Sequence, residues 1–129
     1  MTTPKHVLIV GLEPNLIDFS APDFAAFPGL NAGKVMEGLN AGVADLAARG
    51  YEARLCLTDF GETAETVLRN ELKSRSYDCV LVGAGVRAAA MHFLLFEKII
   101  NVIHEHAPNA RICFNTKPSD TAEAVKRWI

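Results

Sequence analysis

The sequence predicts a single α/β domain, a doubly wound, three-layer sandwich with a four-stranded parallel sheet at its centre. Three observations favour this fold class. Short apolar runs alternate along the chain with longer segments of helical periodicity. The runs are apolar throughout rather than at every second position, which is typical of parallel strands buried on both faces. With 129 residues, the chain has the length of one domain, which we expect to span residues 1–129.

Four apolar runs are the predicted strands. They cover residues 6–10 (HVLIV), about 52–57, 78–82 (DCVLV) and about 110–114. Parallel strands need crossover connections, and these are right-handed in nearly all known sheets. With that rule the simplest strand order is 2-1-3-4, which makes the predicted domain flavodoxin-like.

A helix is predicted after each strand. The four segments are 34–49, a helix that begins at Asp59, 89–105 and a short helix that begins at Ser119 or Asp120. Asp59 and Glu62 have the spacing of a capping box, in which two side chains satisfy free groups at a helix start. In the third helix, the predicted inward stripe consists of Phe93, Phe96, Ile99, Ile100 and Ile103.

Composition and charge exclude several classes of protein. Hydrophobic residues make up 50% of the chain and charged residues 22%, which excludes a disordered chain. The 13 basic and 15 acidic residues are spread along the sequence, so no nucleic-acid partner is expected. No apolar run approaches the roughly 18 residues that span a bilayer, and the first residues lack the pattern of a secretion signal. We therefore expect a cytoplasmic protein with no membrane partner.

The three cysteines, Cys56, Cys79 and Cys113, each lie inside an apolar run. None has the spacing of a metal-binding motif, and an odd number does not suit a framework of disulfides. We therefore predict three buried free thiols that act as small hydrophobic side chains. We expect no metal ion and no cofactor.

The candidate site lies at the carboxyl ends of the predicted strands, where open parallel sheets bind their ligands. Residues 11–33 form the first loop at this edge, and roughly twenty residues is far above the usual length of about two to six. The loop carries Glu13, Asn15 and Asp18, which indicates a binding loop or an interface. The alternative is that its phenylalanines only cover the end of the sheet. Asp59 in the second loop could join Glu13 and Asp18 around a hard cation. The alternative is that Asp59 only caps the helix that follows it.

Two further loops bring hydrogen-bond donors to the same edge. The GAGVR turn at residues 83–87 lets a ligand approach, and Arg87 can hold an anion through its guanidinium group. Asn115, Thr116 and Lys117 follow the fourth strand and add an amide, a hydroxyl and an ammonium group. The alternatives are a plain tight turn and ordinary helix caps. The candidate ligand-binding residues are thus Glu13, Asn15, Asp18, Arg87, Asn115, Thr116 and Lys117.

The sequence contains no complete catalytic constellation, and we assign no catalytic residue. We predict a non-catalytic binding or regulatory domain that recognises a small anionic ligand or a protein partner at this edge. The alternative is a small enzyme of the phosphoryl or acyl transfer type, with Glu13, Asp18 or His92 as acid or base. His92 is the histidine expected to reach the site. A third possibility is a purely structural subunit of an assembly.

Two features favour a symmetric homodimer. The helix at 89–105 is apolar nearly all round, as a helix covered on two sides is. The fourth strand lies at the edge of the sheet, and its sequence RICFN is too apolar to remain bare. The alternatives are that the first loop and neighbouring helices cover these residues, or that the last helix covers the edge with Trp128 and Ile129.

In its length and in the progression HVLIV, YDCVLVGAG and PNARICFNT, the chain resembles the receiver domains of response regulators. That resemblance implies an acidic pair after the first strand, a phosphoacceptor aspartate at the end of the third and a lysine after a fifth. This chain has Gly11-Leu12-Glu13 after the first strand and Gly83 after the third. Only Thr116, after the fourth strand, matches the family pattern. The resemblance therefore predicts the architecture and no phosphoacceptor.

Four longer segments resemble a group of small bacterial proteins to which no activity is assigned. These segments are GLEPNLIDFS, YDCVLVGAGVR, HFLLFEKIINVIHEHAP and ICFNTKPSDTAEAVKRW. The likeness covers most of the chain. It implies a shared flavodoxin-like fold and no particular ligand or cofactor.

Overall fold

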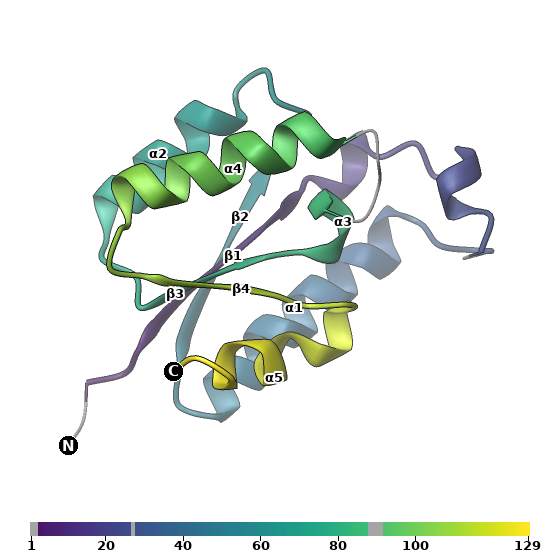
Figure 1. Cartoon of the computed structure of the whole chain (residues 1–129). Helices are drawn as coiled ribbons and strands as arrows, with labels where there is room; N and C mark the ends of the chain where they lie inside the picture. Colours follow the sequence, from purple (N-terminus) through teal and green to yellow (C-terminus); the bar gives the residue numbers. More distant parts are fainter. Residues whose placement is uncertain (1–2, 27, 88–91) are drawn as a thin grey trace.

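The computed structural model describes residues 3–26, 28–87 and 92–129 (Figure 1). It contains a four-stranded parallel sheet in the order β2-β1-β3-β4. The strands are β1 (His6–Leu12), β2 (Glu52–Thr58), β3 (Cys79–Val82) and β4 (Arg111–Phe114). The predicted fold class, sheet and strand order are confirmed.

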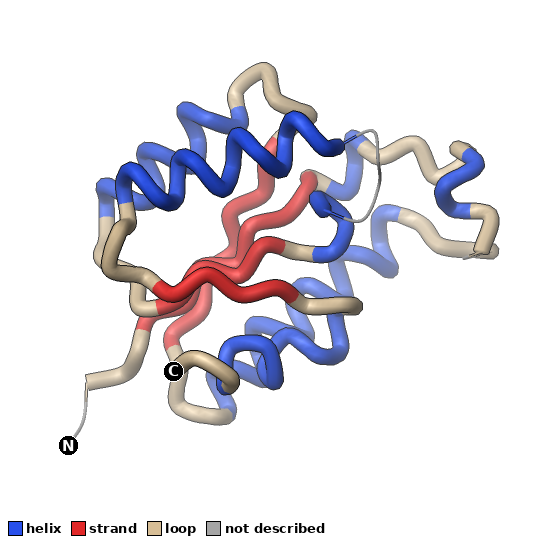
Figure 2. The backbone as a smooth tube through the Cα atoms, in the orientation of Figure 1, coloured by secondary structure: helices blue, strands red, loops and turns tan. Residues whose placement is uncertain are grey.

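Helices cover both faces of the sheet, which gives the predicted three layers (Figure 2). One face carries α1 (Ala32–Ala48) and α5 (Thr121–Lys126), and the other carries α2 (Ala64–Ser74) and α4 (Phe93–His106). The short elements are the helical turn α3 (Ala84–Arg87) and the 3-10 turns η1 (Pro14–Leu16), η2 (Pro22–Phe24) and η4 (Pro118–Asp120). Among the described residues, no helix is long and apolar enough to cross a membrane.

Strand β1 lies inside the sheet and anchors a core on each face. Successive side chains of a strand point to opposite faces, so Leu8 and Val10 pack toward α2 and α4 while Val7 and Ile9 pack toward α1 and α5. None of the four is more than 2% exposed. Fully burying an aliphatic side chain of this size contributes about 1.5–3 kcal/mol, so this one strand stabilises both layers of helices.

Helix α2 begins later than predicted. The Asp59 carboxylate accepts hydrogen bonds from the amides of Gly61 at 3.0 Å and Ala64 at 3.1 Å, and it closes the turn that precedes the helix. The N-cap residue is Thr63. The predicted capping box of Asp59 with Glu62 is therefore wrong, because Asp59 lies before the N-cap position that a capping box requires.

The buried face of α4 agrees with the prediction except at Phe93. Ile99 and Ile103 are buried, and the partly buried Phe96 and Ile100 pack against the same core. The buried residues of α4 are Leu95, Ile99, Val102 and Ile103, which have the spacing of one helical face. Phe93, expected inside, is 63% exposed. It precedes Leu95 by two residues and so lies about 200° around the helix axis from it. The predicted start of this helix, at 89, lies outside the described residues.

The C-terminal residues cover part of the exposed edge of β4. The Arg127 guanidinium donates a hydrogen bond of 2.9 Å to the Phe114 carbonyl. The Arg111 guanidinium lies 5.9 Å from the centre of the Trp128 ring. These contacts agree with the alternative in which the end of the chain covers this edge.

The three cysteines are free and buried, as predicted. Cys56 belongs to the core beneath α2 and α4, whereas Cys79 and Cys113 belong to the core beneath α1 and α5. The sulfur atoms of Cys79 and Cys113 are 3.4 Å apart. This contact between neighbouring strands was not predicted from the sequence.

Candidate functional site

The carboxyl ends of the four strands meet at one edge of the sheet, which we call the C-terminal edge (Figure 1). Main-chain hydrogen bonds align the segments that leave it. The Glu13 amide donates to the Thr58 carbonyl at 2.9 Å, and the Gly83 amide donates to the Val10 carbonyl at 2.9 Å. The candidate residues therefore begin from fixed backbone positions at the predicted edge.

Asn115 is buried at this edge and connects three segments. Its Oδ1 accepts a hydrogen bond of 2.9 Å from the Ala84 amide, and its Nδ2 donates one of 3.0 Å to the Thr121 hydroxyl. Only 6% of the residue is exposed. Both ends of the side-chain amide are therefore occupied by the protein itself.

Arg87 lies beside Asn115, as the sequence predicts. Its Nη2 donates a hydrogen bond to the Asn115 main-chain carbonyl, and its guanidinium carbon lies 5.6 Å from the centre of the Phe114 ring. Its Nε is buried and has no hydrogen-bond partner among the described residues. A buried donor of a charged group without a partner is uncommon in folded proteins. Arg87 thus has a buried hydrogen-bond donor that the described residues leave unused.

Thr116 and Lys117 lie in the turn between β4 and α5. The Thr116 amide donates to Asp120 at 3.0 Å, and the Thr116 hydroxyl and Lys117 amide donate to the same carboxylate. Although desolvation raises the pKa of Asp120, these hydrogen bonds and the nearby Lys117 charge more than offset it, and the pKa lies below 3.8. Thr116 is therefore engaged within its own turn, while Lys117 is exposed.

The side chains of Asn15 and Asp18 in the long first loop make local hydrogen bonds. The Asn15 amide donates to Glu13 at 2.7 Å, and Asp18 accepts from the Ser20 hydroxyl at 2.5 Å and from the Ser20 amide at 3.0 Å. The Ser20 hydroxyl is the largest influence on Asp18 and lowers the pKa of that carboxylate. Partly buried Ile17 packs against the core beneath α2 and α4. The loop is therefore held to the domain by an apolar contact.

The structure does not bring all seven candidate residues together. Arg87 bonds to Asn115, which Thr116 and Lys117 follow along the chain, and these four form one group. In the first loop Asn15 bonds to Glu13, whereas Asp18 bonds to Ser20. No hydrogen bond or ion pair joins the group to these three loop residues within the described part of the chain. The described residues also bring no three carboxylate, imidazole or thiol groups close enough to hold a metal ion.

His92 is buried at the start of α4. Its Nδ1 lies 3.0 Å from the Gly85 carbonyl, and its ring lies 5.5 Å from the Phe60 ring. Both contacts connect α4 to the C-terminal edge, so the prediction that His92 reaches this edge agrees with its position. Its imidazole has no hydrogen bond or ion pair with Glu13 or Asp18 in the described structure.

A group of exposed apolar side chains at the same edge was not predicted from the sequence as one surface. They are Leu16, Phe60, Phe93 and Leu94. The FLLF run at the start of α4 is the sequence signal, because four consecutive large apolar residues cannot all face one side of a helix.

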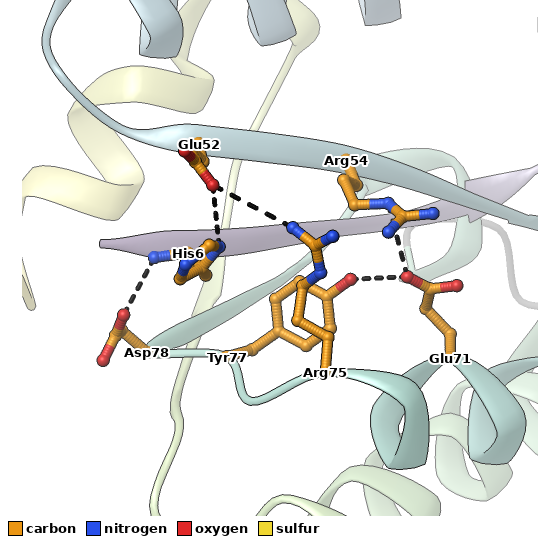
Figure 3. Close-up of polar contacts among 7 residues, drawn as sticks. All are labelled: His6, Glu52, Arg54, Glu71, Arg75, Tyr77 and Asp78. Atoms are coloured by element: carbon orange, nitrogen blue, oxygen red, sulfur yellow. Dashed lines mark hydrogen bonds and ion pairs between the residues drawn. The ribbon is translucent and has the colours of Figure 1, made fainter. Parts of the chain in front are cut away.

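A polar network at the opposite edge of the sheet was also not predicted from the sequence (Figure 3). The Tyr77 hydroxyl donates to Glu71 at 2.5 Å, and Arg54 lies 3.5 Å from the same carboxylate. Burial raises the pKa of Tyr77 the most, and the Glu71 carboxylate raises it further. The His6 amide donates to Asp78 at 2.8 Å. These contacts join β1 and β2 to α2 and to the segment between α2 and β3.

Two surface hollows lie away from the candidate residues. A hollow of about 140 Å³ beside the network is lined by Arg75, Tyr77, His106 and Asn109, among others. A shallow groove of about 420 Å³ is lined by Gly38, Ala41, Gly42, Asp45 and Ser119. Only the groove, through Ser119, comes near one of the predicted loops.

The fold and the edge described above define a doubly wound α/β domain of flavodoxin-like architecture. No sequence profile of a known protein family matches the chain, and no curated protein is significantly similar to it. Its function must therefore be argued from the arrangement of its own residues.

Proposed function

We propose that this chain is a non-catalytic binding or regulatory domain and that a protein partner docks at the C-terminal edge. The distribution of exposed apolar side chains carries the proposal. Six large hydrophobic residues are exposed in the described part of the chain, and four of them lie at this edge. They are Leu16 (48% exposed), Phe60 (42%), Phe93 (63%) and Leu94 (73%). Apolar side chains gathered on one surface are typical of an interaction site.

Phe60, Phe93 and Leu94 form a surface that we call the α4 patch. The Phe60 ring packs 5.5 Å from the ring of His92, the residue before Phe93. The Lys98 ammonium lies 3.5 Å from the carbonyl of the residue after Phe60, which keeps that loop beside the first turns of α4. Full burial of a side chain of this size contributes about 1.5–3 kcal/mol, so a partner that covers the patch gains substantial free energy.

The partner in this proposal is a second copy of the chain in a symmetric homodimer. A twofold axis places the same surface of two copies together, so one apolar patch covers the other. The edge of β4 suits self-association less well, because Arg127 bonds to the Phe114 carbonyl there. A cytoplasmic location belongs to the same proposal, since free thiols are typical of a reducing compartment.

Sedimentation velocity of the wild-type protein over a range of concentrations tests the proposal. We expect a dimer in the wild type and a monomer in the double variant Phe93→Ser, Leu94→Ser. Val67→Ser on α2 is the matched control, because Val67 is also exposed but lies outside the patch. We expect this control to sediment as a dimer.

Two outcomes would contradict the proposal. A wild-type protein that stays monomeric at the highest concentration excludes the homodimer. A dimer that survives the double variant but is lost on Trp128→Ser places the interface at the edge of β4 instead. Circular dichroism of each variant separates loss of the interface from loss of the fold.

Binding of a small anion is a second candidate function, and Arg87 favours it. Its Nε is a buried donor without a partner among the described residues, and Lys117 lies in the adjoining turn. An anion beside the guanidinium would satisfy this donor. Because Nε is buried, the side chains around it must move for an anion to reach it.

The catalytic alternative has less support. Glu13 bonds to Asn15, Asp18 bonds to Ser20, and His92 lies against a main-chain carbonyl. Acid–base catalysis needs such a group within hydrogen-bond reach of a substrate, and pairs of groups with shifted pKa values commonly mark such sites. The separate local contacts of these three residues favour binding over transfer chemistry.

A further inference from the structure

The thiols of Cys79 and Cys113 touch inside the core. Cys79 lies on β3 and Cys113 on β4, and their sulfur atoms are 3.4 Å apart. The register pairs Cys79 with Arg111 and Leu81 with Cys113, so the two cysteines are diagonal neighbours. They are 0% and 1% exposed beneath α1 and α5. Two thiols are thus held in contact in a protein whose third cysteine lies in the other core.

The surroundings of the two sulfur atoms differ in charge. The hydrogen bond from Cys79 is the largest influence on Cys113 and lowers its pKa, burial opposes it, and the Arg127 charge lowers the pKa further. The same hydrogen bond raises the pKa of Cys79, as do burial and the Asp78 carboxylate. Thiolate is the nucleophilic form of cysteine, so the Arg127 charge beside Cys113 and the Asp78 carboxylate beside Cys79 favour Cys113 as the attacking sulfur and Cys79 as the resolving one.

We propose that Cys79 and Cys113 form a reversible disulfide when hydrogen peroxide reaches them, independently of the function proposed above. The Cys113 thiolate attacks one peroxide oxygen, so that an S–O bond forms, the O–O bond breaks and the departing oxygen leaves as water after taking a proton. Cys79 then attacks the Cys113 sulfur, so that the S–S bond forms and the S–O bond breaks. The hydroxide leaves as water with the Cys79 proton. In total, two thiols are oxidised and one peroxide is reduced to two waters.

The position of the pair links its oxidation to the C-terminal edge. Diagonal neighbours in a sheet have Cα atoms about 7–8 Å apart, which exceeds the usual disulfide range of about 4.4–6.8 Å. Closing the bond therefore requires β4 to move along β3. Strand β4 has four residues and pairs with one neighbour, so it is the strand best able to move. Asn115 follows it directly, and its bonds to Ala84 and Thr121 would change with the strand.

Peroxide treatment of the folded protein tests this inference. After quenching and denaturation, we expect free thiols to fall from three to one and the mass to fall by that of two hydrogen atoms. Peptide mapping of wild-type protein should show a Cys79–Cys113 link, and dithiothreitol should restore all three thiols. Mapping needs no variant and so does not depend on the folding of one.

Three variants sharpen the test. Cys56→Ala is the matched control, because Cys56 is also buried but lies in the other core, and it should still form the link. Cys79→Ala should leave a sulfenic acid on Cys113 that dimedone traps. Cys113→Ala should react neither with peroxide nor, afterwards, with dimedone. The inference is overturned if folded wild-type protein keeps three thiols. It is also overturned if Cys56 oxidises as fast as the pair or if the link joins two chains.

Discussion

The Arg87 guanidinium donates a hydrogen bond to the main-chain carbonyl of Asn115, and this contact joins the turn after β3 to the end of β4. The Asn115 side chain strengthens the connection, because its Oδ1 accepts from the Ala84 amide. A residue that the sequence suggests as a ligand-binding group thus holds the C-terminal edge together. Substitution of Asn115 should therefore first change the free energy of unfolding.

We expect Asn115→Ala to lower the free energy of unfolding by about 1–3 kcal/mol, because it removes a buried partner from the Ala84 amide and the Thr121 hydroxyl. Urea denaturation followed by circular dichroism measures this change. Asn101→Ala is the control, since the exposed Asn101 amide bonds only to a carbonyl on its own helix. It should change stability by less than about 0.5 kcal/mol. Equal losses in the two variants would contradict the assignment of Asn115 as a structural joint.

Adjacent leucines on α4 should respond in opposite ways to substitution. Leu95 is 4% exposed in the core, so Leu95→Ala should cost about 2–5 kcal/mol of unfolding free energy. Leu94 is 73% exposed, so Leu94→Ala in the monomer should change it by less than about 0.5 kcal/mol. Denaturant unfolding at low protein concentration compares them without self-association. A larger loss for Leu94 than for Leu95 would contradict the assignment of Leu95 to the buried face of α4.

Hydrophobic pattern was enough to predict the strands of the sheet, because strands such as HVLIV are apolar on both faces and fit no other layer. The right-handed crossover rule then predicted their order. Hydrophobic pattern was not enough for α4, where Phe93 and Leu95 are equally apolar and only the packing against α2 decides which is buried. Residue type alone was likewise not enough to predict the candidate site. The residue types of Thr116 and Asp18 indicate binding groups, but whether a polar side chain meets a ligand or its own neighbour depends on local turn geometry. For these two residues the neighbours were Asp120 and Ser20.

Asp59 should make stability depend on pH in acid. The hydrogen bond from the Thr63 hydroxyl is the largest influence on the pKa of Asp59 and lowers it. Burial raises this pKa, but the amides of Gly61, Thr63 and Ala64 lower it further, so that it lies below the ordinary 3.8. The folded state therefore binds this proton less readily than the unfolded chain. The resulting stabilisation is present above about pH 3.8 and is lost as the pH falls through the lower pKa of the folded state.

The measurement is urea unfolding of wild type and Asp59→Asn between pH 7 and pH 2.5. We expect the variant to be less stable at pH 7 and the difference to shrink as the pH falls below 3.8. Glu62→Gln, which changes an exposed carboxylate three residues away, should follow the wild type throughout. A difference for Asp59→Asn that is the same at every pH would show that the charge of this carboxylate does not stabilise the turn.

Arg87 makes the anion-binding candidate testable without knowledge of the natural ligand. Phosphate and citrate are suitable probes, because guanidinium groups bind both through charge-assisted hydrogen bonds. An anion present at 100 times its Kd stabilises the folded state by about 2.7 kcal/mol, which raises the Tm by several degrees in a domain of this size. We expect such a rise in the wild type at millimolar anion.

The variants identify which cation is responsible for that rise. Arg87→Lys keeps the charge but loses the planar donor set, so this variant should retain only part of the rise in Tm. Lys117→Ala should weaken the rise. Lys73→Ala removes an exposed charge from the end of α2 at the opposite edge and should leave it unchanged. If Lys73→Ala reduces the response as much as Lys117→Ala, the anions act through general screening of charge. If no probe moves the Tm of the wild type, the unpartnered Nε of Arg87 is not an anion site, and the exposed α4 patch is left as the binding surface.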